Sequence, residues 1–212
     1  MTAARRAGEF PTLVAVGAHP DDIEIGCAGS LLRWAHRYRL VLVVATDGGR
    51  SRPAGADRIV EAEKVAASFG AELHVLGLAD GELGAIADVI ASLEAIAAEH
   101  RPARVLVPCH RDSHQDHRHL GRAARAAFRR VDEVLAYESH STEQFAPSFF
   151  VDIDASIDRK CELLSLYESQ LGKVAVSEEF VRVNARRWSL TGCHRDGYVE
   201  AFEVVRLVER GP

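Results

Sequence analysis

Short apolar runs alternate with helix-patterned segments along the first two-thirds of the chain. The runs are too uniformly apolar to have a solvent-facing side and predict buried strands at 12–18, 40–46, 73–76, 104–107 and 133–137. The segments between them predict helices at 26–37, 57–69, 85–100 and 117–130. Regular alternation of this kind predicts a parallel sheet covered by helices on both faces.

The last third of the chain has a different pattern. It predicts a strand at 149–153, an amphipathic helix at 156–171 and a closing strand at 198–207. No repeat, low-complexity stretch or linker divides the sequence. We therefore expect one domain over residues 1–212: an α/β, Rossmann-like three-layer α/β/α fold with a mostly parallel sheet and an elaborated C-terminal part.

Composition argues against several classes of protein but does not identify one. The chain has 26 basic and 31 acidic residues, a formal net charge of −5, and no clustered basic face of the kind that binds nucleic acid. No apolar stretch is long enough to cross a membrane. The four cysteines are scattered without a Cys-x-x-Cys pair, which favours reduced thiols over a disulfide framework. These features predict a cytoplasmic protein without membrane or nucleic-acid partners.

Two segments are dense in histidine and aspartate, and both follow buried strands. The first, Ala18–Glu24, comes after the first predicted strand, and the second, His110–His117, after the fourth. In the common strand order of such sheets, these two strands lie side by side where the order reverses, and ligands bind at their carboxyl ends. We expect the two segments to face each other across one crevice.

The residue types in these segments are those of a catalytic zinc site. Such a site takes three protein ligands from histidine and carboxylate and keeps a position for water. His19, Asp22 and His117 supply that set, with one zinc ion per chain. Asp21 is then available as the general base for the water. His114 is placed to stabilise a developing oxyanion or to protonate a leaving amine.

Other interpretations compete with this one. Taken singly, Asp21 or Asp22 is explained as a helix cap, and a lone histidine as a surface residue. A phosphoesterase also uses loops rich in histidine and aspartate, although it needs two metal ions and more carboxylate ligands. A catalytically silent sugar- or metal-binding module would have lost the base, whereas Asp21 is present. A dinucleotide oxidoreductase is disfavoured because no Gly-x-Gly-x-x-Gly follows the first strand.

The sequence also resembles a known family. His19–Glu24, running into Gly26-x-x-Gly29, is similar to the signature loop of the PIG-L/LmbE-like N-acetylglucosaminyl deacetylases, which include the mycothiol and bacillithiol biosynthetic enzymes. Arg111–His117 is similar to the second metal motif of that family. Further matches are Thr46-Asp47-Gly48, Arg58-x-x-Glu61-Ala62, Ala66-Ala67-x-x-Gly70 and Tyr198–Phe202.

The resemblance implies roles for individual residues. It places the ligands on His19, Asp22 and His117, the base on Asp21 and the oxyanion-stabilising group on His114. It adds Asp116 as a neighbour of His114, and Arg58 and Asp80 as groups that hold sugar hydroxyls. The implied reaction is zinc-dependent hydrolysis of an N-acetyl group on an amino-sugar-containing small molecule, by an enzyme that assembles as a homo-oligomer in several relatives.

The chain departs from the family pattern at two positions in the second motif. Gln115 replaces the usual proline, which we expect to change loop stiffness rather than metal ligation. Asp112 stands where some thiol-pathway members have a mobile tyrosine, so the resemblance alone does not assign their substrate to this chain. Thiol-precursor glycosides, antibiotic intermediates and simple N-acetylglucosamine derivatives all stay open as substrates. The sequence therefore predicts the class of reaction more closely than the substrate.

Overall fold

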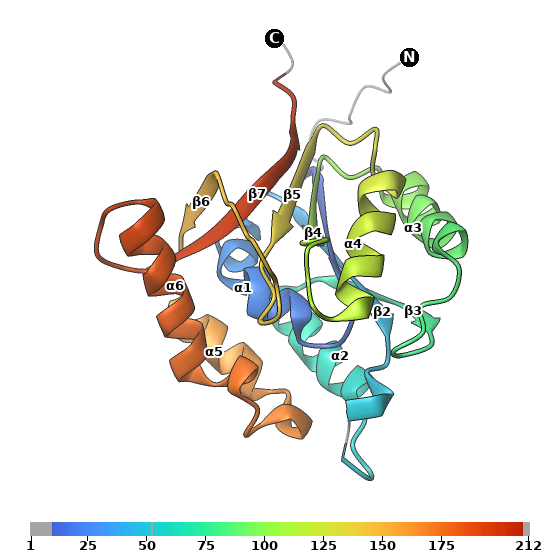
Figure 1. Cartoon of the computed structure of the whole chain (residues 1–212), viewed down its shortest axis with the longest axis horizontal. Coiled ribbons are helices and arrows are strands. Elements are labelled where there is room, and N and C mark those ends of the chain that lie inside the picture. The colour runs from blue at the N-terminus through green and yellow to red at the C-terminus, as the bar shows by residue number, and fades with distance from the viewer. Residues whose placement is uncertain (1–9, 52, 210–212) are drawn as a thin grey trace.

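The computed structural model describes residues 10–51 and 53–209. Its single sheet has seven strands (Figure 1). They are β1 (Thr12–Gly17), β2 (Arg39–Thr46), β3 (Glu72–Leu78), β4 (Arg104–Pro108), β5 (Glu133–Tyr137), β6 (Phe149–Asp152) and β7 (Val199–Leu207). Their order is β3-β2-β1-β4-β5-β7-β6, and β1 to β5 are parallel. The strand order therefore reverses between β1 and β4, as the sequence predicts.

Helices cover both faces of the sheet. They are α1 (Asp22–Trp34), α2 (Arg58–Phe69), α3 (Ile86–His100), α4 (Gln115–Ala127), α5 (Ile157–Ser165) and α6 (Glu178–Gly192), with short 3-10 turns at Gly49–Ser51, Glu168–Gln170 and Val174–Val176. One apolar core joins α1, α2, α5 and α6 to the sheet, and a second joins α3 and α4 to the opposite face. The three-layer α/β/α prediction is confirmed. Within the described ranges, no helix has the length and apolar character needed to cross a membrane.

The central strand β1 contributes to both cores. Leu13 and Ala15 point into the core under α1, and Val14 and Val16 into the core under α3 and α4. None of these four side chains has solvent exposure. A strand buried on both faces needs apolar residues at every position, which is why its sequence reads as a continuous apolar run.

The C-terminal part differs from the prediction in its helices. The helix expected over 156–171 ends at Ser165, and a short 3-10 turn follows. Helix α6 was not predicted. Only a narrow stripe of it is buried, at Val181, Ala185 and Ser189, while Val183 and Leu190 face solvent. The apolar periodicity of this segment is therefore weak, although Ser177 caps the helix by accepting a hydrogen bond from the Phe180 N–H.

Close packing of α1 against β5 positions the first loop. A Cβ on Gly26 would lie 2.1 Å from a ring carbon of Tyr137, so only glycine fits there. The helix kinks at the next residue, Cys27, and the Tyr137 hydroxyl donates to the Val16 carbonyl at 2.7 Å. Helix α1 is thereby held directly beneath the carboxyl ends of β1 and β4.

Candidate active site

The loop after β1 is organised by the Asp22 carboxylate. Asp22 is the first residue of α1, and its Oδ2 accepts hydrogen bonds from the backbone N–H groups of Ala18 at 3.0 Å and His19 at 2.8 Å. Asp21 precedes it with φ 104°, a left-handed conformation that is costly for a residue with a Cβ. The Asp21 side chain makes no capping hydrogen bond. The Asp21 carboxylate pairs with Arg58 instead.

The loop after β4 is organised by a second buried carboxylate. Asp112 accepts the His114 backbone N–H at 2.8 Å and the hydroxyls of Ser141 at 2.6 Å and Thr142 at 3.0 Å. His114 is the N-cap of α4, and its Nδ1 accepts the Asp116 N–H at 3.3 Å. These bonds fix the loop that leads into His117, in the first turn of α4.

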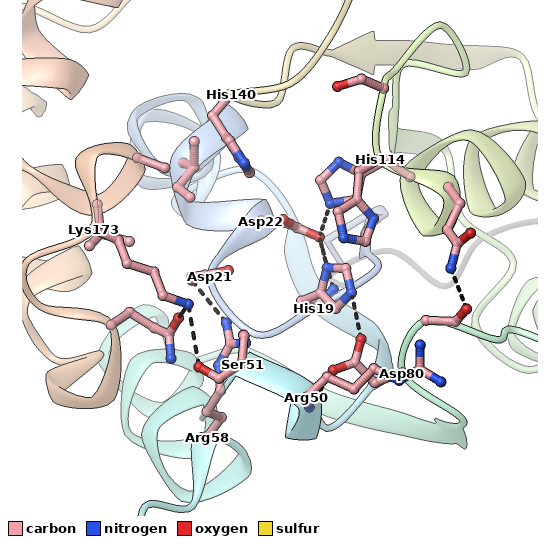
Figure 2. Close-up of a pocket in the computed structure, with 18 of the residues that line it drawn as sticks. His19, Asp21, Asp22, Arg50, Ser51, Arg58, Asp80, His114, His140 and Lys173 are labelled. Carbon is pink, nitrogen blue, oxygen red and sulfur yellow. Dashed lines mark hydrogen bonds and ion pairs between the residues drawn. The ribbon is translucent and has the colours of Figure 1, made fainter. Parts of the chain in front are cut away.

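The two loops converge on a single point. Asp22 Oδ2 lies 3.4 Å from His19 Nδ1 and 3.2 Å from His117 Nε2. One ring nitrogen from each of His19, His114 and His117 lies within 4.8 Å of the others. Figure 2 shows His19, Asp22 and His114 directed toward one another in the cavity. The structure thus brings together the three predicted metal ligands and His114.

The second ring nitrogen of each predicted histidine ligand faces a carboxylate. His117 Nδ1 lies 3.2 Å from Asp112 Oδ2, and His19 Nε2 lies 3.1 Å from Asp80 and 3.2 Å from Asp116. Carboxylates in this position orient histidine ligands in metal sites and make them more basic. Asp112 is a residue of the candidate site to which sequence reasoning gave no role. Its signal was its place in the second motif, where we interpreted it only as a departure.

Electrostatics around the cluster favour a cation. Burial alone lowers the pKa of His19, but hydrogen bonds to Asp116 and Asp22 outweigh it and raise the pKa to about 10. For His117, the same penalty of burial is outweighed by Asp22 and Asp112, again raising the pKa to about 10. The carboxylates therefore hold positive charge on the rings when no metal is bound. Two imidazoles, a carboxylate and surplus negative charge fit a zinc ion. Such an ion would replace the protons that give the two rings their positive charge.

Asp21 lies beside this donor set and pairs with Arg58. Arg58 Nη2 is 2.9 Å from Asp21 Oδ2, and the same nitrogen donates to the Pro20 carbonyl. Burial raises the pKa of Asp21 to about 7, although the Arg58 charge opposes the rise. A buried carboxyl with a pKa near neutrality is suited to general base catalysis.

Arg58 and Asp116, to which the resemblance gives roles at the site, make several contacts within the protein. The guanidinium of Arg58 is buried and also donates to Gly48 and Ser51, so much of its hydrogen-bonding capacity is already used within the protein. The Asp116 carboxylate contacts His19 Nε2 and the Gly81 N–H, whereas only its backbone meets His114. Asp116 is thus a neighbour of His114 through its backbone, while its carboxylate contacts His19 and the Gly81 N–H.

A cavity of about 660 Å³ opens over the cluster. Its wall includes the predicted residues His19, Asp21, Asp22, Arg58, Asp80, His114 and His117. His140, from the loop after β5, also lines it (Figure 2). The turn Val174–Val176 forms another part of the wall. Cationic side chains of Arg50, Arg118 and Lys173 also line it. The cavity thus combines the candidate metal site with polar and apolar surfaces of a size suited to a small molecule.

Solved structures with this fold carry different activities. A conserved protein from Thermus thermophilus is 28% identical, with a TM-score of 0.83 over 96% of this chain and 98% of that one. The N,N'-diacetylchitobiose deacetylase of Pyrococcus horikoshii is 21% identical, with a TM-score of 0.80 over 92% and 84%. GalB, a 4-carboxy-2-hydroxymuconate hydratase from Pseudomonas putida, is 20% identical, with a TM-score of 0.80 over 96% and 100%. The last two likenesses concern the fold alone.

Sequence comparison is more specific. An uncharacterized deacetylase of Escherichia coli K12, YaiS, is 33% identical over 150 residues, which is 66% of this chain and 81% of that protein. The family model of PIG-L, described as GlcNAc-PI de-N-acetylase, matches residues 14–128. That span begins in β1 and contains both loops of the site. The chain belongs to the PIG-L family of de-N-acetylases.

Proposed function

We propose that this protein is a zinc-dependent N-deacetylase that releases acetate from an N-acetylated amino-sugar glycoside. One observation carries the proposal: the buried Asp21 carboxyl lies beside the donor set of His19, Asp22 and His117, at the floor of a cavity of small-molecule size. Membership of a de-N-acetylase family and likeness to a chitobiose deacetylase support the choice of substrate class. The fold alone does not, since GalB is a hydratase.

In the proposed reaction each side chain has one task. His19, Asp22 and His117 hold the zinc ion, which supplies Lewis-acid activation of the acetyl carbonyl and of water. Asp21 accepts the proton of the attacking water, while Arg58 keeps its carboxylate in place. His114 donates a hydrogen bond to the carbonyl oxygen as that oxygen gains negative charge. The proton that Asp21 took from the water then passes from Asp21 to the departing amine.

The protonation state of His114 suits this task. Burial and the neighbouring charges of His117 and His19 lower its pKa, so the ring is neutral at neutral pH. Its Nδ1 accepts the Asp116 N–H, which leaves the ring hydrogen on Nε2. A neutral ring that carries its hydrogen on Nε2 can donate a hydrogen bond to a developing oxyanion.

The test separates the base from the ligand set. We expect Asp21→Asn to lower kcat about 10²- to 10⁴-fold with zinc retained, measured by acetate release from a panel of N-acetylglucosamine glycosides. His117→Ala should lose the zinc of this site, measured by elemental analysis. Asp57→Asn, which removes a carboxylate that caps α2 instead, is the matched control. Full activity in Asp21→Asn would refute the base, and an unchanged zinc content in His117→Ala would refute the ligand.

Three further expectations belong to the proposal. Its partner is a small N-acetylated substrate, a glycoside. A cytoplasmic location and a homo-oligomer are further predictions, which cell fractionation and light scattering would test. Two metal ions in this one cavity would favour the phosphoesterase instead. Zinc that binds but supports no acetate release from any N-acetylated sugar would favour a silent binding module.

A further inference from the structure

A second cluster of metal-ligating side chains lies at the opposite end of the sheet from the cavity. Glu72 is the first residue of the edge strand β3, and His74 follows two residues later, on the same face of the strand. His100 is the last residue of α3, which packs over that face. The parallel strands begin at this end of the sheet, whereas the active site lies where they finish. The length of the sheet therefore separates the cluster from the active site.

Three potential ligand atoms of this cluster converge. His74 Nε2 lies 2.8 Å from Glu72 Oε1 and 3.0 Å from His100 Nε2. One potential ligand atom from each of the three side chains lies within 4.8 Å of the others. The His100 side chain is 3% exposed, that of His74 24% and that of Glu72 45%. One ligand is therefore anchored in the protein, and the others leave a path from solvent.

Hydrogen bonding alone does not satisfy this arrangement. Arg39 Nη2 lies 3.2 Å from His100 Nδ1, so a neutral His100 that accepts this bond carries its hydrogen on Nε2. That hydrogen points at His74 Nε2, which must then be an acceptor. His74 Nε2 would then face the ionised Glu72 oxygen at 2.8 Å as one acceptor against another. With neutral rings and an ionised carboxylate, no assignment of hydrogens satisfies all three contacts.

We propose that Glu72, His74 and His100 bind a divalent transition-metal ion, with zinc as the natural probe. Two imidazoles and one carboxylate form a known zinc ligand set, and a cation turns all three inward atoms into satisfied acceptors. Glu99 Oε1, 3.9 Å from His100 Nε2, adds negative charge nearby. A bound ion ties the end of α3 to the edge strand and stabilises the fold by mass action.

Arg39 is a competitor built into this site. Its Nη1 lies 3.2 Å from Glu72 Oε2, and its Nη2 lies 3.3 Å from Thr12 Oγ1. Metal on His100 Nε2 leaves the hydrogen on Nδ1, so Arg39 must turn from that nitrogen while keeping its other contacts. Arg39→Gln removes a nearby positive charge and offers an amide oxygen to Nδ1. We expect it to tighten zinc binding here by several-fold.

The test counts ions in matched variants. Chelator-stripped protein is dialysed against micromolar free zinc and then subjected to elemental analysis. Wild type and His36→Ala, which removes an exposed histidine elsewhere, should bind one more ion per chain than His74→Ala or Glu72→Gln. A zinc-edge anomalous peak between the three side chains in soaked crystals should locate that ion. Equal zinc in wild type and both site variants would overturn the proposal.

This inference stands apart from the proposed deacetylase activity. If both hold, wild type binds two ions per chain, and His74→Ala retains one together with full acetate release. If the active-site proposal fails, the difference of one ion between wild type and His74→Ala persists. If the second site is wrong, that difference vanishes while the loss of zinc in His117→Ala remains.

Discussion

At the residue scale, the pair formed by Asp21 and Arg58 joins backbone strain to chemistry. Asp21 has a left-handed φ of 104°, and the buried Arg58 guanidinium holds both its carboxylate and the preceding Pro20 carbonyl. Strained residues persist only where their surroundings fix them. We therefore propose that Arg58 positions the base, a role that differs from the sugar binding implied by the family resemblance.

This difference can be measured in the pH dependence of turnover. Burial raises the pKa of Asp21 and Arg58 lowers it, with a net value of about 7. A base must be ionised, so kcat/KM should rise with pH through the pKa of Asp21. In a plot of kcat/KM against pH, Arg58→Met should shift this rising limb to higher pH. Arg50→Met, which removes a cavity cation paired with Glu82 instead, should leave the limb in place. If Arg58→Met raised KM but left the rising limb of the pH profile in place, Arg58 would bind the sugar and would not position the base.

Glu24 shows the cost of burying a carboxyl next to this site. Burial raises its pKa from 4.5 to about 7, more than the hydrogen bond from Tyr167 lowers it. The pKa of Glu24 is higher in the folded protein than in the unfolded chain. The contribution of Glu24 to the free energy of unfolding is therefore most favourable below pH 4.5 and declines as pH rises through 7. A shift of that size corresponds to about 3 kcal/mol. Glu24→Gln should raise Tm at pH 8 relative to wild type, and no gain there would contradict an ionised, buried Glu24.

At the scale of elements, one buried ion pair holds the C-terminal part to the rest of the fold. Lys160 on α5 donates to Glu200 on β7 at 2.6 Å and to the Ile25 carbonyl on α1 at 2.8 Å. Glu200 accepts the backbone N–H groups of Gly29 and Ser30, just beyond the kink in α1. Three elements that are distant in sequence thus meet at two charged side chains.

Removing one partner of this pair should be costly. Lys160→Met leaves the Glu200 charge buried without its cation, and such losses are about 3–5 kcal/mol. The neighbouring Arg159 pairs with Glu162 on the surface, with about half of each side chain exposed. Arg159→Met should therefore cost less than about 1 kcal/mol. Urea unfolding of both variants checks the contrast, and equal free energies of unfolding would refute it.

How far sequence predicts this molecule depends on how each element is buried. Strands β1, β2, β4 and β5 are found because burial on two faces makes them almost continuously apolar. The edge strand β3 has no buried residue, so the prediction that it is buried is wrong. Helix α2 is found because Asp57 caps it and Gly70 ends it in a left-handed conformation. Parallel topology alone brings the loops after β1 and β4 together. The contact of Asp116 with His19 depends on side-chain packing across a third loop, and α6 buries too narrow a stripe to be seen.

At the scale of the whole molecule, the first and last strands of the described residues, β1 and β7, both lie inside one sheet. The last strand, β7, lies between β5 and β6, so an interior strand of the sheet comes from the end of the described sequence. The core beneath α1 combines residues from β1 and β2 with residues from α5 and α6. Neither the parallel part nor the C-terminal part has a core of its own on that face.

This interweaving predicts cooperative unfolding of the whole chain. We expect chelator-stripped protein to melt in one calorimetric transition whose enthalpy equals the van't Hoff value, about 150 kcal/mol near 60 °C for a chain of this length. A chain ended after residue 147 lacks β6 and β7 and exposes the core face under α5 and α6, so it should not fold. Two separate transitions, or a folded truncated chain, would mean that the C-terminal part is a unit of its own. A single transition would support one domain over residues 1–212. In such a domain, loss of β7 removes the support of α1 and, with it, the support of the loop that carries His19, Asp21 and Asp22.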